Sequence, residues 1–191
     1  MELKRELMEA LLQWKNRQQR KPLIIQGARQ IGKTWIMKKF GETYYEHVAY
    51  FNFDASEELC REFENTKDPQ RLIGILRLYT DQPIEPETTL IIFDEIQQSN
   101  KALNSLKYFC EDAPQYHIMA AGSLLGVSLS QGDSFPVGKV EFLNMYPVTF
   151  REFLCADNPQ MYEYLDTLID IGPLPEIVMG KVSESWRRYK V

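Results

Sequence analysis

The chain has 191 residues, 44% hydrophobic and 26% charged, which is typical of one globular domain with an appendage, and its formal net charge of −5 argues against a nucleic-acid coat protein. The apolar runs are too short to span a bilayer, and the charged residues 1–6 lack the apolar segment of a secretory signal. Three widely separated cysteines (Cys60, Cys110 and Cys155) fit a reducing compartment, so we expect a cytoplasmic protein without a disulfide framework.

The first half of the chain shows helical and strand periodicities in alternation. Apolar residues at helical spacing (Leu3, Leu7, Leu11 and Trp14) predict a helix over residues 3–17. A short apolar run predicts a strand over residues 23–26, followed by a loop and a helix that begins near Lys33. Residues 47–53 are rich in aromatic and β-branched side chains and predict a second strand. Helices are predicted over residues 56–64 and 69–79, the second with an apolar stripe of Leu72, Leu76 and Tyr79.

The second half continues the alternation. Residues 90–93 form a continuous apolar run, as expected for a strand covered on both faces. A helix capped by Ser99 or Asn100 runs to about Asp112, with Leu103, Leu106 and Phe109 facing inward. Strands over 116–121 and 139–145, a loop over 126–138, and helices over 149–155 and 159–170 complete the prediction. Alternating strands and helices predict an α/β protein with a parallel sheet and helices on both faces.

Residues 27–34 read GARQIGKT and match the pattern G-x-x-x-x-G-K-[ST] between a predicted strand and a predicted helix. Gly27 and Gly32 permit backbone N–H groups to close around phosphates, and the helix N-terminus adds partial positive charge. Lys33 supplies a charge for the β- and γ-phosphates, and Thr34 offers a hydroxyl to Mg²⁺. We therefore expect a nucleoside triphosphate to be bound by a continuous set of residues: Gly27, Ala28, Arg29, Gln30, Ile31, Gly32, Lys33, Thr34 and Trp35. The alternative is a glycine-bounded surface turn.

Two carboxylates follow the apolar strand at residues 90–93. Because ligands bind at the carboxyl ends of parallel strands, Asp94 falls at the same edge of the sheet as the phosphate loop. We predict that Asp94 holds Mg²⁺ through its water shell and that Glu95 orients and polarises a water aimed at the γ-phosphate. The alternative for this pair is a solvated turn after a buried strand.

Other residues support two interpretations each. Ser123, after the fourth strand, either contacts the γ-phosphate or its attacking water, or caps a following helix. Arg151 either reaches a neighbour's nucleotide or is a solvated helix residue. We expect His47 and His117 to be core or surface histidines and not metal ligands. We expect the aromatic group Tyr44, Tyr45, Tyr50, Phe51 and Phe53 to be core and not a base-stacking platform.

Four segments in order, GARQIGKT, LIIFDEIQ, AGSLLG and MYPVTFREFL, resemble a family of prokaryotic AAA-type P-loop ATPases whose members usually carry a C-terminal domain of unassigned function. The similarity runs through nearly the whole chain and includes GPLPE at residues 172–176. The first two motifs are general to P-loop ATPases, and the tyrosine–proline motif at 146–153 is more specific to the family. Many relatives have Gly-Arg where this chain has Gly138-Lys139, which weakens any arginine contact to phosphate there.

The resemblance implies a five-stranded P-loop NTPase sheet in the order 5-1-4-3-2 and the cofactors ATP and Mg²⁺. It assigns Lys33 and Thr34 to the Walker A motif, Asp94 and Glu95 to Walker B, and Ser123 to a sensor. We expect an ATPase core with an N-terminal helix over residues 1–148, and over 149–191 a partial helical lid that ends before a C-terminal domain. Assembly into oligomers is an expectation by analogy with AAA proteins.

Three functions compete. The first is Mg²⁺-dependent ATP hydrolysis that drives movement of the lid or of an attached domain. The second is a nucleotide-gated interaction module, in which ATP binding controls a protein partner or the chain's own missing C-terminal domain, and slow hydrolysis resets it. The third, a small-molecule kinase, is disfavoured because the Asp94-Glu95 pair suits water activation and no arginine-rich lid is apparent.

Overall fold

The computed structural model describes residues 5–122, 136, 138–167 and 176–189. The chain divides into two compact units, a larger one of Ala10–Met145 and a smaller one of Met1–Glu9 with Tyr146–Val191. Compactness alone does not define a functional domain, so the division into residues 1–148 and 149–191 stays a prediction.

The larger unit is built on a five-stranded parallel sheet. Its strands are β1 (Leu23–Gln26), β2 (His47–Asn52), β3 (Thr89–Asp94), β4 (His117–Gly122) and β5 (Glu141–Asn144). Their order across the sheet is β2-β3-β4-β1-β5, and every neighbouring pair is parallel. This is the expected order 5-1-4-3-2 counted from the other edge, so the predicted fold class is confirmed.

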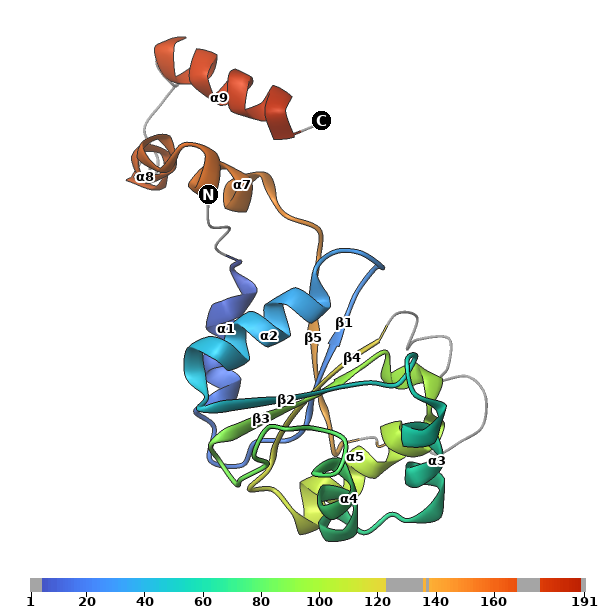
Figure 1. The fold of residues 1–191 in the computed structure, drawn as a ribbon. Coiled ribbons are helices and arrows are strands. Elements are labelled where there is room, and N and C mark those ends of the chain that lie inside the picture. Colours follow the sequence, from blue (N-terminus) through green and yellow to red (C-terminus); the bar gives the residue numbers. More distant parts are fainter. Residues whose placement is uncertain (1–4, 123–135, 137, 168–175, 190–191) are drawn as a thin grey trace. The chain divides into compact units, whose positions relative to one another are not determined.

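Helices cover both faces of this sheet (Figure 1). One face carries α1 (Leu7–Lys15) and α2 (Lys33–Tyr44), and the other carries α3 (Glu57–Asn65), α4 (Pro69–Leu76) and α5 (Asn100–Asp112). A 3-10 turn, η1 (Ile96–Gln98), links β3 to α5. The hydroxyl of Ser56, the carboxylate of Asp68 and the hydroxyl of Ser99 cap α3, α4 and α5 by accepting N–H bonds from their first turns.

Side-chain alternation along the strands separates two apolar layers. Phe51 and Phe93 belong to the cluster beneath α3, α4 and α5, where aromatic rings meet edge to face. The intervening residues of β2 and β3 point to the face that carries α2. Because successive side chains of a strand point to opposite faces, Tyr50 and Asp94 lie on the side of the sheet where the loop before α2 lies.

One sequence prediction about the core was wrong. We predicted Tyr79 in the apolar stripe of a helix over residues 69–79, but α4 ends at Leu76 and Tyr79 is 38% exposed. The chain leaves the helix through a tight turn, in which the N–H groups of Leu78 and Tyr79 bond to the carbonyls of Ile75 and Leu76. Leu72 and Leu76 are fully buried as predicted.

The smaller unit is helical, with α7 (Phe150–Asp157), α8 (Pro159–Thr167) and α9 (Glu176–Tyr189). Thr149 and Glu152 form a capping box at the start of α7, each side chain accepting the other's backbone N–H. Leu154, Met161 and Val178 form its small core. Helix α9, which we did not predict, packs Trp186 against Phe150 with ring centroids 4.9 Å apart.

A buried ion pair joins the N-terminal segment to α7 within the smaller unit. Arg5 Nε donates to Glu152 Oε1 at 3.0 Å, and Arg5 Nη2 donates to the carbonyl of Tyr146 at 2.6 Å. The backbone N–H of Glu6 also bonds to Glu152. Burial acts to raise the pKa of Glu152, but these N–H bonds and the Arg5 charge outweigh it and hold the pKa below its ordinary value. The tyrosine–proline motif thus has a structural role at Glu152.

Among the described residues, no helix is both long enough and apolar enough to cross a membrane.

Candidate functional site

The loop from Gly27 to Gly32 joins the end of β1 to the start of α2, and its two glycines are required for different reasons. A Cβ on Gly27 would lie 2.3 Å from the carbonyl oxygen of Met145, so the neighbouring backbone excludes a side chain. Gly32 has φ +94, in the left-handed region, and is the residue before α2. No side chain caps α2, so its first N–H groups remain for an anion.

Lys33 lies inside this loop. Its ammonium donates to the carbonyls of Gly27 at 3.0 Å and Ala28 at 2.6 Å, and only 8% of the residue is exposed. Burial lowers the pKa of Lys33, while the carboxylates of Glu95 and Asp94 act in the opposite direction. Ammonium, loop carbonyls and helix N-terminus therefore surround one small volume.

Thr34 and Asp94 meet at the carboxyl edge of the sheet. Thr34 Oγ1 donates to Asp94 Oδ2 at 2.6 Å, although the two residues are 60 positions apart in sequence. A hydroxyl has one proton and two lone pairs. With its proton given to Asp94, Thr34 keeps its lone pairs for a cation, and a hydroxyl with a carboxylate is an oxygen donor set that suits Mg²⁺.

Tyr50 belongs to the same cluster, which sequence reasoning did not foresee. Its hydroxyl donates to Asp94 Oδ2 at 2.9 Å, and the Lys38 ammonium lies 3.6 Å from its ring centroid. Burial raises the pKa of Tyr50, and the Asp94 charge raises it further, so the phenol stays protonated. We expected Tyr50 to be core. Tyr50 is instead half-buried, with its hydroxyl bonded to Asp94, whereas Phe51 and Phe53 are buried as predicted.

Glu95 directly follows β3 and has φ 50, a left-handed conformation that is uncommon for a non-glycine residue. Its backbone N–H donates to Asp94 Oδ1 at 3.1 Å, and its carboxylate accepts a bond from Gln97 Nε2. Within the described part of the chain, Gln97 Oε1 is buried without a partner. Gln97 is a second residue of the site that the sequence pattern did not reveal.

The remaining predicted residues are distributed as follows. Ala28, Arg29 and Gln30 are exposed loop residues, Ile31 is half-buried, and Trp35 is 46% exposed on the first turn of α2. Gln30 has φ 62, a second left-handed position in the loop. Ser123 lies outside the described residues. Strand β4 lies between β1 and β3 and ends at Gly122, which pairs with Gln26, the last residue of β1. The carboxyl end of β4 therefore lies beside the start of the phosphate loop.

Two basic residues lie elsewhere. Lys139 precedes β5 and pairs with Glu111 at 2.8 Å, so it lies at the amino ends of the strands, whereas the phosphate loop lies at their carboxyl ends. Arg151 belongs to the smaller unit, where it bonds to the hydroxyl of Tyr162 at 3.3 Å.

Of the two histidines, His117 is buried and His47 is half-buried. His117 is buried and bonded through Nδ1 to the Tyr45 hydroxyl at 2.7 Å. Among the described residues no group of three His, Cys, Asp or Glu is arranged to hold a metal.

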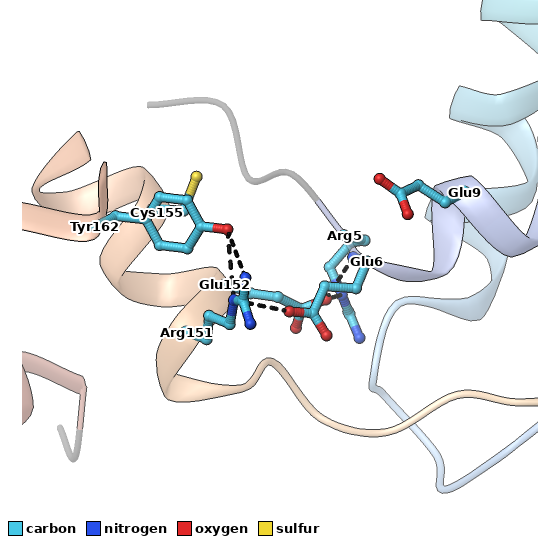
Figure 2. A pocket seen from close by; sticks show the side chains of 7 residues that line it. All are labelled: Arg5, Glu6, Glu9, Arg151, Glu152, Cys155 and Tyr162. Carbon is cyan, nitrogen blue, oxygen red and sulfur yellow. Dashed lines mark hydrogen bonds and ion pairs between the residues drawn. The ribbon is translucent and has the colours of Figure 1, made fainter. Parts of the chain in front are cut away.

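The smaller unit has a pocket of about 270 Å³ lined by Arg5, Glu6, Glu9, Arg151, Glu152, Cys155 and Tyr162 (Figure 2). Its charged groups bond largely to one another: Arg5 to Glu152, and Arg151 to Glu6 and Tyr162.

The residues at the loop edge fit a magnesium-bound triphosphate. The backbone around Gly27 leaves no space for a side chain, and the Lys33 ammonium lies inside the loop. The Thr34–Asp94 pair provides hard oxygen donors. With a five-stranded parallel sheet in which β4 lies between β1 and β3, this arrangement defines the P-loop NTPase class.

Comparison with known families agrees. A family model described as an AAA domain matches residues 19–154, more than half of the chain, and the chain belongs to this family of AAA-type P-loop ATPases. ATP binding and hydrolysis are general properties of that family. No curated protein matches the chain.

Solved structures found similar to this chain include RuvB of Thermotoga maritima, titled a Holliday junction branch migration motor, at 16% identity and a TM-score of 0.47, with 86% of this chain and 52% of that chain covered. Another is PCH-2 of C. elegans, at 15% identity and a TM-score of 0.47, with 90% and 50% covered. The chain therefore spans about half the length of these structures.

Proposed function

We propose that this chain binds ATP with Mg²⁺ and hydrolyses it slowly, and that the reaction moves the helical lid or an attached domain. The observation that carries the proposal is the 2.6 Å bond between Thr34 Oγ1 and Asp94 Oδ2. It joins the end of the phosphate loop to the end of β3, and the same two groups would have to share one hydrated cation. Family membership supports the activity in general terms.

Each residue has a role that follows from its chemistry. Lys33 would exchange its loop carbonyl partners for phosphate oxygens, which are stronger acceptors because they are charged. Thr34 and Asp94 would hold the metal, Thr34 directly and Asp94 through water. Bound Mg²⁺ supplies charge neutralisation across the β- and γ-phosphates. The loop N–H groups and the first turn of α2 orient the anion.

Glu95 is our candidate for orienting the attacking water. Its carboxylate follows the metal-binding residue by one position, and its left-handed backbone turns it out of the strand. In the structure one of its oxygens, Oε2, accepts a bond from Gln97 Nε2, and the carboxylate keeps further lone pairs with which it would accept a bond from water. A sensor role for Ser123 stays a prediction.

Movement of the lid would begin where the larger unit ends. Met145 is the last residue of that unit. The Met145 carbonyl lies against Gly27, and its methyl group lies near Gly32. The Met145 N–H donates to the carbonyl of Gln26. A shift of the loop around phosphates would therefore reach the peptide bond that leads into the smaller unit. This contact also supports the second candidate, a nucleotide-gated interaction module in which binding controls a partner and hydrolysis resets it.

The test is nucleotide binding and phosphate release for the wild type, Lys33→Ala and Glu95→Gln, each at several protein concentrations. We expect Lys33→Ala to lose ATP binding and Glu95→Gln to bind ATP but release no phosphate. Turnover that rises with protein concentration would indicate assembly. Hydrolysis retained in Glu95→Gln would remove Glu95 from the mechanism, and tight wild-type binding without phosphate release would favour the gated module. A wild type that binds no nucleotide refutes both.

A further inference from the structure

The carboxylate of Asp94 is held on three sides. Oδ2 accepts from Thr34 at 2.6 Å and from Tyr50 at 2.9 Å, and Oδ1 accepts from the Glu95 N–H at 3.1 Å. Asp94 is only 4% exposed. Since water has little access to the carboxylate, a donor that is removed is not readily replaced. The orientation of the carboxylate therefore depends on these three groups.

Tyr50 is the donor that comes from outside the two ATPase motifs. It lies on β2, next to β3, with Tyr50 opposite Ile92 and Asn52 opposite Asp94. Its hydroxyl therefore reaches diagonally along the pair to Asp94. The Lys38 ammonium, one helical turn beyond Thr34, lies 3.6 Å from its ring centroid. Tyr50 thus connects α2 with the end of β3, and Lys38 occupies a ring face that a base would need for stacking.

We propose that Tyr50 is a positioning residue that sets the orientation of Asp94 and so strengthens the Mg²⁺-dependent part of nucleotide binding. The inference rests on the proposed function. The bond from Tyr50 keeps Oδ2 directed at Thr34. The Thr34 hydroxyl then keeps donating its proton to Asp94 Oδ2, which leaves its lone pairs directed at the cation. If the carboxylate turned away, the Thr34 hydroxyl would have no fixed direction. Tyr50 acts on the cation through Asp94 and does not touch phosphate.

The test compares ADP affinity in EDTA with ADP affinity in Mg²⁺, measured by calorimetry on the full chain. The ratio of the two dissociation constants is the gain in affinity that Mg²⁺ provides. For Tyr50→Phe we expect ADP affinity in EDTA to stay within about twofold of the wild type and the Mg²⁺ gain to fall about three- to tenfold, the effect of one lost hydrogen bond. Hydrolysis is not needed for this readout.

Tyr45→Phe is the matched control. It removes the phenol hydroxyl of another half-buried tyrosine, but one that bonds to His117 in the core and not to the site. We expect it to lower stability and leave the Mg²⁺ gain unchanged. An undiminished gain in Tyr50→Phe, or an equal reduction in both variants, overturns the proposal for Tyr50. A wild type with no Mg²⁺ gain would instead count against the proposed function itself.

Discussion

The carbonyl oxygen of Met145 occupies the position next to Gly27 that any larger residue would need, since a Cβ on Gly27 would lie 2.3 Å from it. Gly27 opens the phosphate loop, and Met145 ends the larger unit. The Met145 N–H also bonds to the carbonyl of Gln26 at 2.8 Å. The start of the loop and the end of β5 are therefore fitted to each other through backbone atoms, which cannot rotate out of the way as side chains can.

We expect Gly27→Ala to lower nucleotide affinity at least about tenfold and to destabilise the larger unit by about 1–3 kcal/mol, the usual range for forced overpacking. Affinity is measured by calorimetry and stability by urea denaturation. Gly74→Ala is the control, because Gly74 is an exposed helical residue and a methyl group added there would have no atom within 4 Å. It should gain up to about 1 kcal/mol from helix propensity. Equal behaviour of the two variants would refute the argument from close approach.

The Thr34 hydroxyl provides a second test. Thr34→Val keeps the shape of the side chain but removes the donor to Asp94 and the ligand for a cation. We expect Thr34→Val to lose at least about tenfold of the Mg²⁺ gain in ADP affinity, since bonds to charged groups contribute about 1.5–3 kcal/mol. Thr34→Ser, which keeps the hydroxyl, should retain most of it. A full Mg²⁺ gain in Thr34→Val would show that the cation is held elsewhere.

The difference between foreseen and unforeseen site residues has a physical origin. Two short motifs contain the foreseen residues: Lys33 and Thr34 come after the loop that follows β1, and Asp94 and Glu95 lie at the end of β3. Parallel topology brings the carboxyl ends of these strands together. Tyr50 reaches Asp94 only through the register of β2 against β3, which no single-strand pattern encodes. Gln97 is reached through the left-handed turn at Glu95. Both depend on tertiary geometry.

The helices show the same division. The helix predicted over residues 56–64 matches α3 to within one residue. The helix predicted to begin at a cap, Ser99 or Asn100, matches α5, and Ser99 is the cap. Helix α9 was not predicted. Its buried residues are Val178 and Ser185, a sparse stripe, and Trp186 packs against Phe150 of α7, a contact between helices far apart in sequence. Tertiary contacts, and not local periodicity, account for that helix.

The buried pair of Arg5 and Glu152 leads to a stability prediction for the smaller unit. Their side chains are 5% and 4% exposed, so removing one partner leaves a buried charge (Figure 2). We expect Arg5→Met to lower the opening free energy of α7 by about 3 kcal/mol, measured by hydrogen exchange of its backbone amides. The double variant Arg5→Met, Glu152→Gln should recover at least about 1 kcal/mol, because the uncompensated charge is gone. If the change in opening free energy of the double variant equals the sum of the changes in the two single variants, the two side chains are not coupled.

His117 predicts how the larger unit responds to acid. Burial, together with the nearby Arg20 and Lys15 charges, lowers the pKa of His117 to about 3, whereas an unfolded histidine has a pKa of about 6.5. Between these values the unfolded chain binds one more proton than the folded chain. The contribution of neutral His117 to stability is therefore complete above about pH 6.5 and is lost as the pH falls toward 3, by about 1.4 kcal/mol per unit.

We expect His117→Gln to remove this part of the pH dependence, because glutamine can accept the Tyr45 hydroxyl bond but does not titrate in this range. Urea denaturation of both proteins between about pH 5 and 7.5 measures the difference. The wild type should lose about 1.4 kcal/mol more than the variant for each unit below about 6.5. Its imidazole should also show no titration in NMR spectra down to about pH 5. Parallel stability curves for the two proteins, or a titrating His117 signal, would mean that the imidazole is not neutral and buried in the folded chain.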